Sequence, residues 1–246
     1  MKISPAHPPR EGEGQPAAAQ KPPPGSGGGR LKRERRTAPP GDEWFRTQPW
    51  ATQALLEREA FPAMIWECAC GDGIMARPLL DAGYEVIATD LRQRGYGVGG
   101  VDFLATSRLP SGCDSIITNP PYGAGRATAF AQHALALGAR KVALLLRTSF
   151  LEGDQRERLL FAVQPPCRVW QFAGRVTMWR GDDLAPRDTG GATPFAWFVW
   201  ERHHRGTQVG WIPQSADPVV LARKGRRGGH ASPPPALSGS DQPPLL

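Results

Sequence analysis

The sequence predicts an α/β protein built on a doubly wound, mostly parallel β-sheet. Three observations predict this fold class. β-rich apolar runs alternate with helical apolar patterns, a glycine-rich turn joins the first strand to a helix, and the last two β-rich runs have no helix between them. Alternation favours parallel strands with crossover helices, whereas two successive strands favour an antiparallel pair. We therefore expect a Rossmann-like sheet that ends in an antiparallel C-terminal hairpin.

The expected elements follow one another in a regular order. Apolar residues at helical spacing predict helices at Thr47–Glu59, Gly73–Gly83, Gly125–Gly138 and Leu151–Ala162. Runs rich in β-branched and apolar residues predict strands at Ala63–Ala69, Tyr84–Asp90, Asp114–Thr118, Lys141–Arg147, Cys167–Trp179 and Thr193–Arg202. Pro78 lies inside the second expected helix, where a proline restricts or bends the backbone.

Composition divides the 246 residues into one domain and two tails. Residues 1–41 and 202–246 have few large apolar side chains, so they cannot bury enough surface to offset chain entropy. We expect disordered basic tails there and a folded domain over 42–201. The tails carry net charges of +5 and +4, and the domain carries −2. The tails could hold nucleic acid through its phosphates, or they could be solvated ends.

Cysteine spacing and hydropathy argue against several classes of protein. Cys68, Cys70, Cys113 and Cys167 form neither a disulfide framework nor a pattern with zinc spacing, so we expect no metal site. The chain has no secretory signal pattern and no apolar run long enough to span a membrane. We expect a cytoplasmic protein without membrane association.

The glycine-rich turn ECACGDG leaves two kinds of cofactor open. Gly71, Gly73 and Ala76 match the dinucleotide fingerprint G-x-G-x-x-A, and Asp90 ends the next strand, where an acid can bind ribose hydroxyls. A nicotinamide dehydrogenase is therefore one interpretation. Glu67 weighs against it, because a carboxylate beside a pyrophosphate is repulsive. The same carboxylate suits a ligand with an ammonium or sulfonium charge, such as S-adenosylmethionine.

Four segments together resemble a known family. WECACGDG, VIATD, VDFL and NPPY are similar to the motifs of class I S-adenosylmethionine-dependent methyltransferases, over roughly Trp44 to Glu201. More narrowly, they resemble the amino-group enzymes, above all small phage- and prophage-type DNA adenine-N6 methyltransferases. The resemblance implies S-adenosylmethionine as cofactor. It implies these cofactor-binding residues: Thr47, Glu67, Ala69, Gly71, Gly73, Asp90, Leu91, Asp102 and Phe103.

By the same resemblance, Asn119, Pro120, Pro121 and Tyr122 are the catalytic residues. An exocyclic amine is a poor nucleophile because its lone pair is delocalised into the ring. The side-chain oxygen of Asn119 and the carbonyl of Pro120 can accept its two hydrogens, which directs the lone pair at the methyl group. The prolines keep this segment rigid, and Tyr122 can stack on a base that has turned out of a helix.

The NPPY segment predicts methylation of an amino nitrogen, but it leaves the acceptor open. N6 of adenine in DNA is the acceptor we expect; an RNA, a glutamine in a protein, or a non-catalytic relative that only binds the cofactor are the alternatives. The loop of residues 180–193 has room for a few base contacts, so we expect a short or loose recognition site. Among the tryptophans, Trp197 and Trp200 are expected in the core and Trp179 near the substrate.

Overall fold

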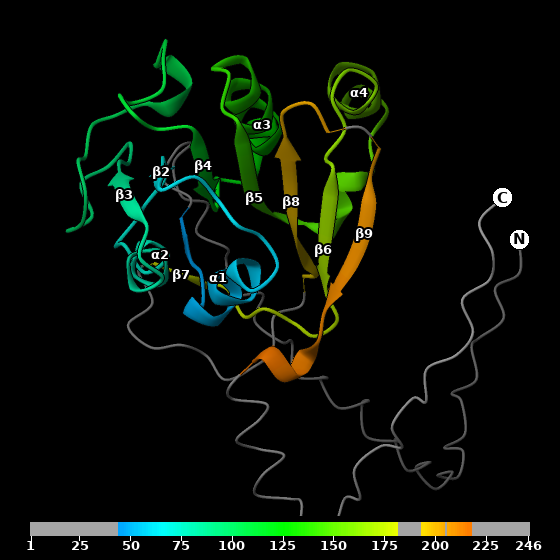
Figure 1. The fold of residues 1–246 in the computed structure, drawn as a ribbon, viewed down its shortest axis with the longest axis horizontal. Coiled ribbons are helices and arrows are strands. Elements are labelled where there is room, and N and C mark those ends of the chain that lie inside the picture. Colours follow the sequence, from blue (N-terminus) through cyan, green and yellow to red (C-terminus); the bar gives the residue numbers. More distant parts are fainter. Residues whose placement is uncertain (1–43, 182–192, 205, 218–246) are drawn as a thin grey trace, which may run out of the picture. The chain divides into compact units, whose positions relative to one another are not determined.

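A computed structural model of the chain describes residues 44–181, 193–204 and 206–217. The expected tail over 1–41, the rest of the C-terminal tail and most of the 180–193 loop lie outside these residues. Within them a seven-stranded sheet has the order β3-β2-β4-β5-β8-β6-β9 (Figure 1). The strands are β2 (Met64–Glu67), β3 (Glu85–Ala88), β4 (Ser115–Thr118), β5 (Lys141–Arg147), β6 (Arg168–Phe172), β8 (Phe195–Glu201) and β9 (Gln208–Ile212).

The predicted fold class is confirmed, and only one strand of the sheet runs against the others. β2 is parallel to β3 and β4, β4 to β5, and β6 to β9, whereas β8 is antiparallel to both β5 and β6. The expected C-terminal hairpin is therefore the pair β6–β8. It does not form the sheet edge, because β9 continues the sheet beyond β6. The predicted domain end at Glu201 is therefore too early, since the chain past it supplies a strand and the turn η5 (Gln214–Ala216).

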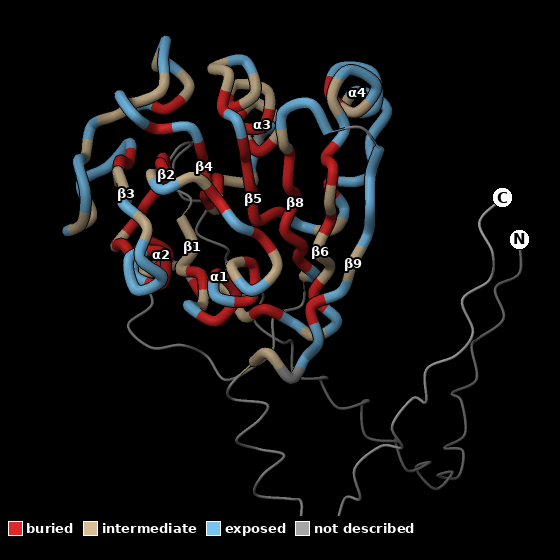
Figure 2. The backbone as a smooth tube through the Cα atoms, viewed as in Figure 1, coloured by how far each residue is buried: buried red, intermediate tan, exposed pale blue. Residues whose placement is uncertain are grey.

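Helices cover both faces of the sheet. On one face, α3 (Arg126–Ala136), the short turn η1 (Phe103–Ala105) and the segment after β5 pack on the apolar side chains of β4, β5 and β8. On the other face lie α1 (Pro49–Leu56) and α2 (Ala76–Asp81). Figure 2 shows the central strands β4, β5 and β8 largely buried and β9 mostly exposed. Trp197 and Trp200 are 0% and 1% exposed, which confirms their predicted place in the core.

Two predicted helices differ from the observed ones for local reasons. The second begins at Ala76, so Pro78 lies in its first turn, where a missing N–H breaks no helical hydrogen bond. The fourth divides into the turn η3 (Thr148–Leu151), a single α-turn α4 (Asp154–Arg156) and a π-helical turn η4 (Glu157–Phe161). Gly153, with φ of 125°, separates the first two pieces because this backbone conformation cannot continue a helix.

A second, two-stranded sheet joins segments that are far apart in the sequence. β1 (Phe45–Arg46) pairs antiparallel with β7 (Trp179–Arg180). The single strand predicted over Cys167–Trp179 is therefore two strands, one in each sheet. This pairing brings the segment before α1 against the loop that follows β6.

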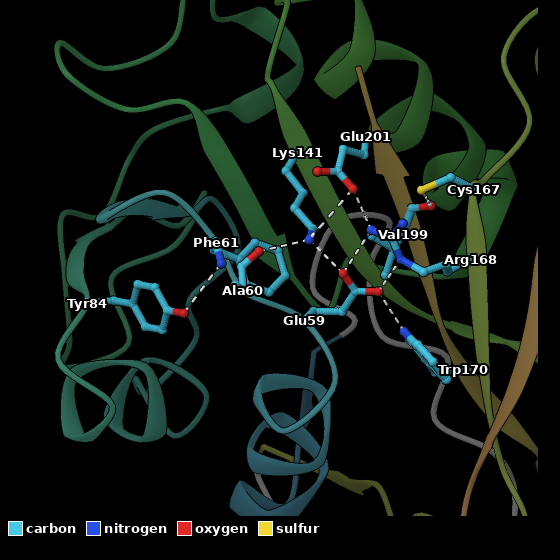
Figure 3. A network of polar contacts seen from close by, with 10 residues as sticks. All are labelled: Glu59, Ala60, Phe61, Tyr84, Lys141, Cys167, Arg168, Trp170, Val199 and Glu201. Carbon is cyan, nitrogen blue, oxygen red and sulfur yellow. Dashed lines mark hydrogen bonds and ion pairs between the residues drawn. The ribbon is translucent and has the colours of Figure 1, made fainter. Parts of the chain in front are cut away.

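A buried charge network ties α1 to the amino-terminal edge of the parallel strands (Figure 3). Glu59, 4% exposed, lies 2.6 Å from Nζ of Lys141 and accepts a 2.8 Å hydrogen bond from Nε1 of Trp170. Arg168 donates to both Glu59 and Glu201, the latter at 2.6 Å. Burial acts to raise the pKa of Glu59, but the hydrogen bonds from Arg168, Lys141 and Trp170 outweigh it and leave that pKa lowered. The stabilisation is therefore present at neutral pH and is lost as the pH falls below the ordinary range of a carboxylate.

We expect Glu59→Ala to lower the free energy of unfolding by about 3 kcal/mol, because it leaves the buried Lys141 and the partly buried Arg168 short of their carboxylate. Urea denaturation at pH 7 measures this change. Glu57→Ala, which removes an exposed carboxylate from the same segment, is the matched control and should change stability by less than about 1 kcal/mol. Equal effects of the two substitutions would contradict the role assigned to the network.

Candidate active site

The carboxyl-terminal ends of β2, β3 and β4 lie side by side and form one wall of a pocket. Parallel register pairs Glu67 with Ala88 and Trp66 with Ile116, so Glu67, Asp90 and Asn119 emerge at the same edge. Ligands bind at this edge in open α/β sheets. The pocket encloses about 790 Å³, part of it open to solvent. Of the predicted site residues it is lined by Thr47, Glu67, Ala69, Gly71, Asp90, Leu91, Asp102, Phe103, Asn119, Pro120 and Pro121.

Asp90 holds the glycine-rich turn against the end of β3. Its Oδ2 accepts a 2.9 Å hydrogen bond from the N–H of Gly71, and its Oδ1 accepts one of 2.8 Å from the N–H of Arg92. Gly71 has φ of 55°, and a β-carbon there would lie 2.9 Å from Cε3 of Trp44. Asp90 therefore has a structural role beside the ribose contact that the sequence predicts. Oδ1 also lies 3.7 Å from Nε of Arg94.

Gly73 does not line the pocket, although the sequence predicts it as a cofactor residue. It has φ of 78°, and a β-carbon there would lie 2.3 Å from Cγ of Tyr96. Tyr96 belongs to the second glycine cluster, GYGVGG, so this glycine allows two turns to pack closely. Position 73 requires glycine because the ring of Tyr96 packs so closely against it.

Glu67 is a buried acid without a hydrogen-bond partner on one oxygen. The residue is 1% exposed, it lines the pocket, and its Oε2 receives no hydrogen bond. Burial raises the pKa of Glu67 well above its ordinary value of 4.5, and the nearby carboxylates of Asp90 and Asp72 raise it further. An unpaired buried oxygen in a pocket wall costs stability, so a site that keeps one is suited to a ligand that donates to it or carries positive charge.

The predicted adenine-binding pair forms a wall beside these acids. Asp102 is exposed, and its Oδ1 accepts a 3.0 Å hydrogen bond from the N–H of Leu104, which begins the turn η1. Phe103 is 2% exposed and packs against Trp66 and Phe130, with ring centroids 5.2 and 4.7 Å away. Asp102 is therefore the more accessible of the two to a ligand.

Asn119 is held by the strand that precedes α1. Its Nδ2 donates to Oγ1 of Thr47 at 2.9 Å and to the carbonyl of Phe45 at 3.4 Å. The hydroxyl of Tyr122 donates to Oδ1 of Asn119 and also lies 3.3 Å from the carbonyl oxygen of Leu145. The asparagine side chain thus bridges β1 and the NPPY segment.

Tyr122 does not line the pocket, so the predicted stacking on a base stays a prediction. Its ring is half-buried, with its centroid 5.6 Å from that of Phe195. The guanidinium of Arg147 lies 5.2 Å from the centre of the same ring. Trp179, expected near the substrate, is 9% exposed, belongs to β7 and does not line the pocket.

Several pocket residues were missed by sequence reasoning. Arg46 does not line the pocket itself, but it forms a 2.7 Å ion pair with Asp72, which does. Trp44 lies between the guanidinium groups of Arg46 and Arg94, 5.6 and 4.6 Å from its ring centre. Arg126, at the start of α3, also lines the pocket. No local motif marks Trp44 or Arg46, because their positions depend on the pairing of β1 with β7.

The cysteines in the turn are not candidate nucleophiles. Burial, reinforced by Glu67, raises the pKa of Cys70 to about 12 and also raises that of Cys68. Both remain thiols at neutral pH. Across residues 44–181, 193–204 and 206–217, no group of His, Cys, Asp and Glu could hold a metal ion. No helix in that part of the chain is long and apolar enough to cross a membrane.

Comparisons with known proteins yield structural matches. No protein-family model matches the chain, and no curated protein matches its sequence. A modification subunit assigned to a type I restriction enzyme of Vibrio vulnificus is 10% identical, with a TM-score of 0.50 over 76% of this chain and 54% of that chain. The 23S rRNA methyltransferase ErmE is 16% identical over 65% and 70% of the two chains, with a TM-score of 0.47. A dimethyladenosine transferase of Plasmodium falciparum is 15% identical over 63% and 62%, with a TM-score of 0.44.

The chain spans about half the length of the Vibrio subunit. At this low identity the likeness shows the fold alone. The chain has the Rossmann-like α/β fold that it shares with that subunit.

We expect Glu67→Gln to stabilise the ligand-free protein at pH 8. The raised pKa means that ionisation of Glu67 favours the unfolded state, so the wild type loses stability as the pH rises above about 4.5. Glutamine does not ionise. The melting temperature of the variant should therefore exceed that of the wild type by about 3 °C or more at pH 8, and the difference should shrink towards pH 4.5. Thermal denaturation from pH 4.5 to 8 measures it, with Glu85→Gln, an exposed acid on β3, as control. A gain that does not depend on pH would contradict the assignment.

Proposed function

We propose that this protein is an enzyme that transfers a methyl group from S-adenosylmethionine to an exocyclic amino nitrogen, with N6 of adenine in DNA as the acceptor. One observation carries the proposal. The unpaired oxygen of Glu67 and the two acceptors of the NPPY segment, Asn119 and Pro120, line the same pocket. A site for a cation therefore adjoins a site for an amine.

The pocket residues fit this cofactor better than a nicotinamide dinucleotide. Glu67 offers a buried carboxylate to the positively charged methionine end, where a pyrophosphate would be repelled. Gly71 lines the pocket without a side chain, and the carboxylate of Asp90 lies in the same wall, where it could accept from the ribose hydroxyls. When bound, S-adenosylmethionine supplies an electrophilic methyl group on a sulfonium.

The NPPY segment supplies acceptors for the amine. Oδ1 of Asn119 has a second lone pair beyond the one that Tyr122 uses, and the carbonyl of Pro120 precedes a second proline that restricts it. Acceptors on both amino hydrogens favour a pyramidal nitrogen. Correct placement in a site shielded from water contributes most of the rate enhancement, so no strong base is required.

Cations around the pocket favour a nucleic acid as the acceptor. Arg126 lines the pocket, and Arg147 is exposed at the end of β5 beside Tyr122. Both are placed where phosphates of a bound strand could reach them. The basic residues of the two ends of the chain add sequence-independent attraction. The Vibrio subunit with the same fold is assigned to a restriction enzyme, which agrees with DNA as the acceptor.

The experiment is transfer of labelled methyl from S-adenosylmethionine to unmethylated double-stranded DNA, ribosomal RNA and total protein. We expect label in DNA, recovered as N6-methyladenine. Asn119→Ala should lower the rate by roughly 100-fold or more, because the amine loses an acceptor that matters in the transition state. The affinity of the same variant for S-adenosylhomocysteine, measured by calorimetry, should equal that of the wild type.

Each alternative acceptor has its own outcome in this assay. Label in RNA or protein alone would replace DNA as the substrate and leave the reaction in place. Bound S-adenosylhomocysteine without any transfer would indicate a non-catalytic cofactor-binding protein. Tight binding of NAD without binding of S-adenosylhomocysteine would overturn the assignment of S-adenosylmethionine as the cofactor.

Glu67→Gln should weaken S-adenosylhomocysteine binding by about tenfold, because an ionised carboxylate binds the ligand ammonium more strongly than an amide does. The wild-type affinity should rise with pH, since binding requires ionisation of a group whose pKa is raised in the free protein. Calorimetry in two buffers of different ionisation enthalpy should detect proton release on binding by the wild type and none by the variant. Equal affinity of the two proteins across pH 6–8 would rule out this contact.

A further inference from the structure

The side-chain amide of Asn119 is held in one orientation by β1. An asparagine amide can turn by 180°, which exchanges its donor end with its acceptor end. The carbonyl of Phe45 can only accept, so the nitrogen must face it, 3.4 Å away. The sulfur of Met178, also an acceptor, lies 4.0 Å from the same nitrogen. The oxygen therefore faces the NPPY segment.

The shortest of the contacts made by Nδ2 of Asn119 is the one to Thr47. Its Oγ1 lies 2.9 Å from Nδ2 of Asn119, and Thr47 is 2% exposed. Neither this hydroxyl nor that of Tyr122 fixes the amide orientation by itself, because a hydroxyl can donate to an oxygen or accept from a nitrogen, whereas the carbonyl of Phe45 can only accept. A turned amide would present hydrogens to an incoming amine and repel it. The orientation set by β1 is thus the one that the amine requires.

We propose that Thr47, which follows β1, is a positioning residue for Asn119: its hydroxyl anchors Nδ2 beside the carbonyl of Phe45, and the amide oxygen stays directed towards the acceptor amine. This inference rests on the proposed function. It assigns Thr47 a role different from the cofactor contact that the family resemblance implies. The two roles differ in the step they affect: a positioning residue changes the rate of methyl transfer, and a cofactor contact changes cofactor affinity.

The kinetic test compares Thr47→Val, which has the same shape without the hydroxyl, with Thr47→Ser, which keeps it. We expect the valine variant to lower kcat by about tenfold or more at saturating cofactor, because small misplacement of a reacting group costs much rate. Its Kd for S-adenosylhomocysteine should stay within about twofold of wild type. The serine variant should restore kcat. In an Asn119→Ala background, Thr47→Val should cause no further loss, since the two residues act as a unit.

A second readout does not depend on activity. Asn119 is the single asparagine of the 246 residues, so protein made with ¹⁵N-asparagine has one side-chain amide pair in its NMR spectrum. That pair should shift in Thr47→Val and keep its wild-type position in Thr47→Ser. Thermal denaturation checks that the variants are folded, and Thr47→Ala replaces the valine variant if valine is not accommodated.

The outcomes separate the two proposals. Wild-type kcat in a folded Thr47→Val protein, or weaker S-adenosylhomocysteine binding with kcat unchanged, would overturn the positioning role and leave the proposed function intact. An unshifted amide pair would also overturn it. No methyl transfer by the wild type to any acceptor would overturn the proposed function, and the positioning role with it.

Discussion

The parallel pairing of β2 with β3 on one side and β4 on the other is the constraint on which the site depends. Each of these strands ends in a polar residue or leads directly into one, and no two of these residues are neighbours in the sequence. Only a common direction and register bring Glu67, Asp90 and Asn119 to one edge. An antiparallel partner at either position would send one of the three to the opposite end of the sheet. The crossover through α2 connects β2 to β3, and the segment that contains η1 connects β3 to β4; α2 packs on one face of the sheet and η1 on the other.

Two buried glutamates show how the same chemical group serves stability and binding in one molecule. Glu59 accepts hydrogen bonds from Arg168, Lys141 and Trp170, and its pKa is lowered. Glu67 has an oxygen without a donor, and its pKa is raised. The first lies at the amino-terminal edge of the sheet, where it ties the segment after α1 to the strands β5 and β6 (Figure 3). The second lies at the carboxyl-terminal edge, where its missing partner makes it receptive to a ligand.

Features with a local cause could be predicted from the sequence, and features that depend on distant pairing could not. The strands and crossover helices follow from apolar periodicity, and Gly71 and Asp90 follow from a turn whose geometry is local. Gly73 was placed in the pocket because the fingerprint contains it, but its glycine is needed for packing on Tyr96. β9 was missed because QVGWI lies in a polar segment and carries an exposed Trp211. Trp44, which lines the pocket, and Arg46, which pairs with the pocket residue Asp72, were missed because their positions depend on the β1–β7 pair.

The pairing of β1 with β7 also orders events during synthesis. β1 emerges from the ribosome before every strand of the main sheet, whereas its partner emerges only after β6. β2, β3 and β4 can therefore pair, and Glu67 and Asp90 can meet, while β1 still lacks a partner strand. The wall that holds Glu67 and Asp90 can therefore form before β1, which carries the Phe45 carbonyl against Asn119, has its partner strand.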